Sequence, residues 1–130
     1  MEEEALTGRI IGCAMRVHSI LGPGFLESVY RKALRHELVK AGFHAVEEVA
    51  IAVQYDGIVV GEFSADLMVE DKVMIELKAN QALAVANEVQ LVNYLTATGI
   101  EIGLLLNFGA QRLEFKRKTR SYAPKNLPKA

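Results

Sequence analysis

The sequence predicts a single α/β domain built around a mixed sheet with helices on its faces. Two stretches with the apolar spacing of helices open the chain, and residues 43–79 then change to a period of two with many β-branched residues. A third helical stretch separates these strands from a nearly continuous apolar segment at residues 100–108, the pattern of a strand covered on both faces. This order of elements suits a sheet with parallel and antiparallel neighbours. We expect one domain over residues 1–130, because a chain of 130 residues can bury a core of its own.

The first two helices are defined by their apolar spacing and by their ends. Apolar residues recur every three or four positions over residues 5–21, and Gly22-Pro23-Gly24 then ends this helix. The same spacing over residues 25–41 predicts a second helix, which Gly42 ends.

Residues 43–79 are expected to form an antiparallel meander of about three strands. Tyr55-Asp56-Gly57 has the composition of a tight hairpin turn, and Glu70-Asp71 forms the next turn. The expected strand segments cover residues 49–53, 58–60, 62–69 and 73–79.

The last third of the chain supplies one helix and two strands. A helix is expected over residues 83–98, with Gly99 as its stop. The apolar strand 100–108 follows, and a last strand is expected over residues 112–116.

Composition and charge exclude several classes of protein. The chain is 51% hydrophobic and 24% charged with a net charge of −1, which is globular and argues against a uniformly basic surface for nucleic acid. A single cysteine, Cys13, excludes an internal disulfide framework and a thiolate zinc cluster. The acidic start of the chain is unlike a secretory signal, and no apolar run approaches the roughly 18 residues of a membrane span. We therefore expect a cytoplasmic protein with no membrane partner.

The near-neutral charge hides an asymmetry along the chain. Residues 116–130 carry six basic and no acidic residues, so the preceding residues have a net charge of −7. This basic C-terminal tail is predicted to bind the phosphates of nucleic acid, although a solubilising tail has the same composition. The residues predicted to contact nucleic acid are Lys116, Arg117, Lys118 and Arg120.

Two acidic residues and a lysine are predicted to meet on one face of the sheet. Glu76 and Lys78 are two residues apart, so a strand points both side chains to the same face, in an otherwise apolar segment. If the hairpin turns at Glu70-Asp71, Asp66 lies close to Glu76 on the neighbouring strand. Two adjacent carboxylates repel each other, and a divalent cation such as Mg²⁺ or Mn²⁺ relieves that repulsion. An exposed strand face with a cross-strand ion pair has the same pattern, so Asp…Glu-x-Lys alone does not decide between the two.

Two further motifs accompany these residues. Residues 24–30 read G-x-x-E-x-x-Y, which places Glu27 in the first turn of the second helix, and Gln90 and Tyr94 are neighbours on one face of the third helix. With the Asp66 and Glu76 segments, these motifs resemble the GxxExxY proteins of the PD-(D/E)XK nuclease superfamily, over about residues 8–118.

The resemblance implies a restriction-endonuclease-like αβββαβ core, here with an extra N-terminal helix, and one acidic site. It implies that Asp66, Glu76 and the backbone carbonyl of Leu77 bind Mg²⁺ or Mn²⁺ and that Lys78 is the catalytic lysine. Ala65 occupies the position of the superfamily's proline before the first acid, which is variable in the family.

The same resemblance assigns three supporting residues on helices. Glu27 matches a helix acid that serves as a further metal ligand, directly or through water. Gln90 and Tyr94 match a helix pair that supports the site and the phosphate. A helix-terminal acid stabilised by the helix dipole explains Glu27 without any metal, and core packing explains Tyr30 and Tyr94 equally well.

The expected function is a metal-dependent nuclease that hydrolyses phosphodiester bonds, with DNA as the expected substrate. One alternative is a non-catalytic module that binds nucleic acid or protein on a nuclease fold. A second is a junction resolvase, which requires a symmetric homodimer with two sites. A small catalytic domain gains substrate reach by pairing, so a homodimer is also expected.

Overall fold

The computed structural model describes residues 2–120 and contains three helices and five strands. The helices are α1 (Glu2–Leu21), α2 (Glu27–Lys40) and α3 (Val85–Thr98). The strands are β1 (Ala45–Tyr55), β2 (Ile58–Val69), β3 (Val73–Lys78), β4 (Ile102–Asn107) and β5 (Glu114–Thr119). The predicted order of elements is thereby confirmed.

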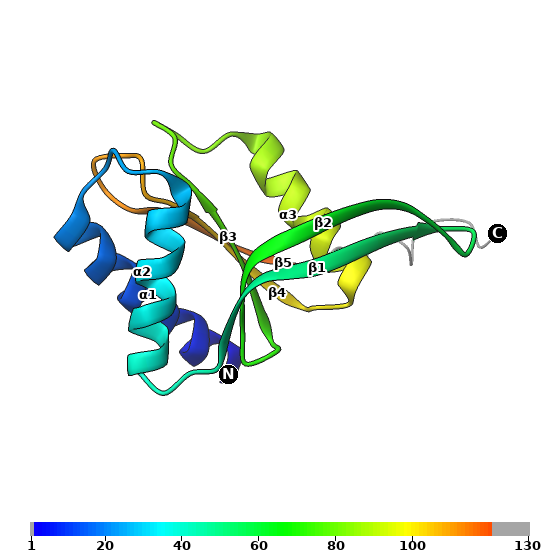
Figure 1. Ribbon diagram of the computed structural model, residues 1–130, viewed down its shortest axis with the longest axis horizontal. Helices are drawn as coiled ribbons and strands as arrows, with labels where there is room; N and C mark the ends of the chain where they lie inside the picture. Colours follow the sequence, from blue (N-terminus) through cyan, green and yellow to red (C-terminus); the bar gives the residue numbers. More distant parts are fainter. Residues whose placement is uncertain (1, 121–130) are drawn as a thin grey trace.

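The five strands form one mixed sheet in the order β1-β2-β3-β4-β5. Only β3 and β4 are parallel, because α3 connects them as a crossover, and the other neighbours are antiparallel. Helices α1 and α2 cover one face of the sheet and α3 covers the other, which makes a three-layer α/β structure (Figure 1).

The central strand β3 explains why this segment of the sequence is almost entirely apolar. Val73, Ile75 and Leu77 belong to the buried cluster under α1 and α2, whereas Met74 packs in the cluster under α3. Glu76 therefore points to the α3 face in a strand that is buried on both sides.

Tyr30, the last residue of the G-x-x-E-x-x-Y motif, stabilises the loop between α1 and α2. Its fully buried hydroxyl donates a hydrogen bond to the carbonyl of Gly22 (2.5 Å) and accepts one from the backbone N–H of Phe25 (3.1 Å). Its ring stacks on Phe108 with 4.7 Å between centroids. The contacts of Tyr30 are therefore those of a packed residue with a satisfied hydroxyl group.

Several boundaries differ from the sequence expectation: β1 is longer than the expected 49–53, β5 lies later than the expected 112–116, and two differences change the description of the chain. The segments 58–60 and 62–69 form one continuous strand, because Gly61 between them stays paired with Val53. The pairing shifts by one residue between Val53 and Gln54, which makes a β-bulge. The chain from Lys116 to Thr119 belongs to β5, so the basic tail expected from residue 116 begins inside the sheet. The rest of that predicted tail, residues 121–130, lies outside the described residues.

No helix within residues 2–120 combines the length and the apolar character that crossing a membrane requires.

Candidate active site

Asp66 and Glu76 come together where β2 and β3 separate. The β2–β3 ladder ends with Leu67 opposite Ile75, so the next opposed positions are Asp66 and Glu76. Glu76 is only 8% exposed. Burial, followed by a hydrogen bond to the Asp66 carboxyl and the charge of that group, raises the pKa of Glu76 from 4.5 to about 9. Glu76 is therefore protonated at neutral pH, and the two acids lie side by side as predicted from the register of the hairpin.

The backbone around Asp66 holds its carboxylate in place. Oδ2 of Asp66 accepts a hydrogen bond of 2.7 Å from the backbone N–H of Leu77. The backbone of Asp66 also acts on the Glu76 carboxyl and opposes the rise in its pKa. Across the sheet, Glu48 lies opposite Asp66 in the β1–β2 register and has a φ of 52°, and the ladder omits this pair. Strand β1 is thus distorted at Glu48, the residue opposite the first acid.

Lys78 lies on the same face of β3 as Glu76, two residues further along. Its positive charge opposes the rise in the pKa of Glu76, which shows that the two groups are close enough to interact. Lys78 is half-buried, and its backbone carbonyl accepts a hydrogen bond of 2.8 Å from the N–H of Phe108. The predicted grouping of Asp66, Glu76 and Lys78 is therefore present.

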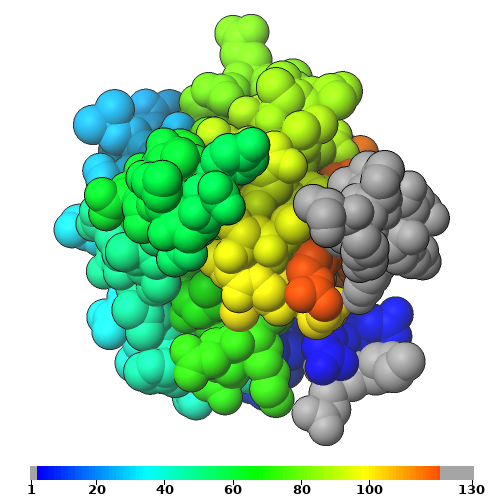
Figure 2. Space-filling model, turned by 90° about the vertical axis from the view of Figure 1, so that its right-hand side faces the viewer, coloured from blue at the N-terminus to red at the C-terminus, as the bar shows by residue number. Residues whose placement is uncertain are grey.

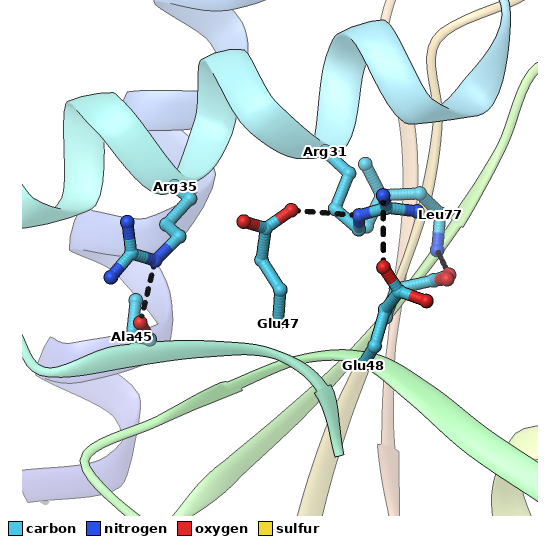
Figure 3. A network of polar contacts seen from close by, with 7 residues as sticks. Arg31, Arg35, Ala45, Glu47, Glu48 and Leu77 are labelled. Carbon is cyan, nitrogen blue, oxygen red and sulfur yellow. Dashed lines mark hydrogen bonds and ion pairs between the residues drawn. The ribbon is translucent and has the colours of Figure 1, made fainter.

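Arg31 of α2 was not singled out from the sequence, yet it reaches the acidic residues of β1. Its Nε donates to Glu47 at 2.8 Å and an Nη atom lies 3.2 Å from Glu48, as Figure 3 shows beside Leu77. The hydrogen bond with Glu47 and the negative charges of Glu48 and Asp66 raise the pKa of Arg31. The guanidinium group of Arg31, one helix turn from Glu27, therefore lies close enough to Asp66 to interact with its charge.

Tyr94 joins the site from α3, whereas Gln90 lies further out. Tyr94 is 8% exposed, and its pKa is raised by burial and then by the negative charges of Glu76 and Asp66. Gln90, one turn earlier on α3, is exposed and lies with Tyr94 along a surface groove. The predicted helix pair therefore borders the site, with Tyr94 as its inner member.

Glu27 does not complete a cluster of three acids. It is exposed at the first turn of α2, on the helix that covers the opposite sheet face. Within residues 2–120, no three His, Cys, Asp or Glu side chains are grouped closely enough to hold one metal ion. Asp66 and Glu76 thus form a pair of acids with no third such ligand grouped with them among the described residues, and the role of Glu27 as a further ligand stays a prediction.

The predicted basic residues at the end of the chain are not one patch. Lys118 forms an ion pair of 2.7 Å with Glu88, and Arg120 forms one of 2.7 Å with Glu101. Lys116 is opposite Leu105 in the register, which puts its side chain on the α3 face, whereas Arg117 alternates to the other face. Because Leu105 is in turn opposite Glu76, Lys116 shares a sheet row with the acidic site.

Solved structures with the same architecture define the class of this fold. The crystal structure of SSO0001 aligns with a TM-score of 0.57 and 17% identity, covering 76% of this chain and 52% of that one. LHK-Exo, an alkaline exonuclease from Laribacter hongkongensis solved in complex with dAMP, aligns with a TM-score of 0.52 and 14% identity, covering 87% and 79%. The chain therefore spans about half the length of SSO0001, and it has the restriction-endonuclease-like fold.

Residues 4–118 match the family model of the PD-(D/E)XK nuclease superfamily. Since this match spans most of the chain, the protein belongs to the PD-(D/E)XK nuclease superfamily. The narrower resemblance to the GxxExxY proteins stays a prediction. A comparison with curated proteins found no match.

Proposed function

We propose that this protein is a metal-dependent nuclease that hydrolyses phosphodiester bonds, with DNA as its substrate. The observation that carries this proposal is the buried Glu76 carboxyl hydrogen-bonded to Asp66, with Lys78 on the same sheet face. A buried carboxyl pair is costly to maintain, and pKa values perturbed in this way are typical of functional sites.

The donor set fits a hard divalent cation such as Mg²⁺ or Mn²⁺. Asp66 and Glu76 would hold it with carboxylate oxygens, together with the backbone carbonyl of Leu77. Glu76 keeps its proton at neutral pH chiefly because it is buried and then because Asp66 lies beside it, and a bound cation would displace that proton. The bound cation would supply a water of lowered pKa and stabilise charge on a phosphoryl oxygen.

The surrounding residues would orient the substrate. The ammonium group of Lys78 would donate hydrogen bonds to the attacking water or to a phosphoryl oxygen, because its charge lies beside the acids. Gln90 and Tyr94 would bind the phosphate next to the cleaved bond, and Glu27 would contact the cation through water.

The basic residues of β5 would bind the remainder of the strand. Lys116 is the best placed of them, because it shares a sheet row with Glu76 and is exposed. Arg117, Lys118 and Arg120 would add charge further along, Lys118 after releasing Glu88. The resulting affinity should fall as salt rises.

The test is cleavage of plasmid, linear and branched DNA, and of RNA, in Mg²⁺ or Mn²⁺ by wild type and Asp66→Asn. Asparagine keeps an oxygen for the N–H of Leu77 but removes the charge that holds the cation. We expect cleavage by wild type and none by Asp66→Asn, with Glu62→Gln on the exposed part of β2 as the matched control. Equal cleavage by wild type and Asp66→Asn would rule out this site.

The alternative is a non-catalytic module that uses the nuclease fold to bind nucleic acid or protein. Such a module needs no cation, so it predicts no Mn²⁺ binding in calorimetry and nucleic-acid binding that survives Asp66→Asn. A junction resolvase, the third candidate, additionally predicts preference for four-way junctions over linear duplexes.

A further inference from the structure

The distal part of the β1–β2 hairpin projects from the domain as an arm of two strands, residues 50–64 (Figure 1). Only positions 67–69 of β2 pair with β3, so within residues 2–120 the arm has no further strand beside it. Asp56 and Gly57 at its tip both have positive φ, 54° and 78°, which is the two-residue turn that matches strand twist. The arm is therefore a paired hairpin with a tight turn rather than a loop.

The arm exposes large apolar side chains where a monomer would place charges. Tyr55 is 73% exposed, Ile58 63% and Val60 61%. Edge strands commonly avoid association with other chains through charged residues or proline. The edge strand from residue 49 to 55 contains neither.

A groove of about 1260 Å³ runs between α3 and the arm, which lines it with Ala52, Val53, Gln54 and Phe63. Figure 2 faces this side of the molecule, with the green arm alongside the yellow atoms of α3. The α3 wall exposes Val85 (75%) and Val89 (53%). None of the residues that line the groove is charged, which disfavours the phosphate backbone of nucleic acid as its main occupant and confines a bound phosphate to Gln90 and Tyr94, where the groove borders the acidic site.

We propose that the β1–β2 arm of a second copy of this chain occupies the groove, in a two-fold dimer with reciprocal exchange of arms. The apolar arm and the apolar groove adjoin on one chain. A two-fold axis between two copies therefore buries the arm and the groove of both copies at once. The exposed apolar side chains of the arm and of α3 offer roughly 700 Å² per copy, close to the about 800 Å² of a standard interface. The tight turn of the arm lowers the ordering cost of binding.

The test measures oligomeric state by sedimentation equilibrium on the full chain across micromolar concentrations. Wild type should be a dimer. Val60→Lys on the arm and Val89→Glu on the groove wall should each raise the dimer dissociation constant by roughly a hundredfold or more, because each buries an unpaired charge. The matched control is Val39→Glu, an exposed valine on α2 at the opposite sheet face, which should leave the dimer intact.

A mixture of two variants with opposite charges then tests whether the arm of one copy contacts the groove of the other. Mixing Val60→Lys with Val89→Glu should restore a heterodimer, since one contact becomes an ion pair and the other stays as in wild type. Circular dichroism of each variant checks folding. A monomeric wild type, dissociation by Val39→Glu, or no recovery in the mixture would overturn the proposal.

The same variants separate this inference from the proposed function, on which it does not rest. If nucleic acid occupies the groove instead, Val89→Glu weakens oligonucleotide binding while the oligomeric state does not change, and the dimer proposal fails. Loss of cleavage in Asp66→Asn with the dimer intact would leave both proposals standing.

Discussion

The backbone N–H of Leu77 donates a 2.7 Å hydrogen bond to Oδ2 of Asp66, so the strand that carries the second acid also orients the first. Asp66 is half-buried, and this bond together with the Glu76 carboxyl fixes its position without any cation. The site is therefore assembled by the two strands themselves just beyond the end of their ladder, where the two acids stay opposite each other.

We expect Asp66→Ala to destabilise the protein and Asp66→Asn to leave its stability close to wild type. Alanine removes the acceptor of the buried Leu77 N–H, which costs about 1–3 kcal/mol of unfolding free energy, whereas asparagine supplies another oxygen. Urea unfolding without metal measures the difference. Both variants should lose Mn²⁺ affinity in calorimetry, and Mn²⁺ binding by either at wild-type strength would contradict the assignment.

Glu76→Gln should make the stability of the metal-free protein less dependent on pH. The folded pKa of Glu76, about 9, lies above its ordinary 4.5, so unfolding releases a proton between these values. Protonated Glu76 makes its full contribution to the free energy of unfolding below pH 4.5. That contribution declines as the pH rises from there to about 9, by up to about 1.4 kcal/mol per pH unit. The glutamine side chain in this variant cannot titrate, so the decline should disappear.

Urea unfolding in a chelator, at two pH values inside that window, measures the effect. Glu62→Gln, on the exposed part of β2, should keep the wild-type pH dependence. Parallel pH profiles for wild type and Glu76→Gln would show that Glu76 is ionised in the folded protein.

Arg31→Ala should lower the free energy of unfolding by about 1–3 kcal/mol, because it leaves Glu47 and Glu48 without their cation. Arg31 is largely buried by its partners, whereas Arg16 pairs with Glu37 at a side-chain exposure of 60%. Arg16→Ala is therefore the control, with an expected loss below about 1 kcal/mol. A double-mutant cycle with Glu47→Gln isolates the coupling, and additive effects would contradict it.

Tyr30→Phe should destabilise the protein by about 1–3 kcal/mol while leaving metal-dependent cleavage measurable. The change removes the hydroxyl that joins Gly22 to the N–H of Phe25 but keeps the ring stacked on Phe108. Tyr55→Phe, at an exposed tyrosine, is the control for loss of a hydroxyl. Complete loss of cleavage by a folded Tyr30→Phe would give this tyrosine a catalytic role.

Periodicity alone predicted most of the fold. The third helix, expected over residues 83–98, runs from Val85 to Thr98, and Gly99 ends it with a φ of 77°. Apolar spacing and glycine are local signals, so they predict helices and their ends without knowledge of the tertiary structure. The bulge beside Val53 was not predictable, because it depends on the pairing of two strands.

The acidic pair was accessible from sequence for a similar reason. The turn at Glu70-Asp71 fixes the register, and both residues have positive φ there, 55° and 54°. Counting back from that turn places Asp66 opposite Glu76. Arg31 and Glu48 were missed because a contact between a helix and a distant strand leaves no spacing in the chain.

The stretch from Gly24 to Tyr30 has a consequence for how relatives of this chain should be interpreted. Its tyrosine binds the loop that joins two helices, while its glutamate is exposed and apart from the paired carboxyl groups. Conservation of the tyrosine of this stretch in another protein would thus report a shared corner between two helices. The inference of hydrolytic chemistry there should depend on the equivalents of Asp66, Glu76 and Lys78, and a chain that keeps the corner but lacks those three would be expected to fold alike and cut nothing.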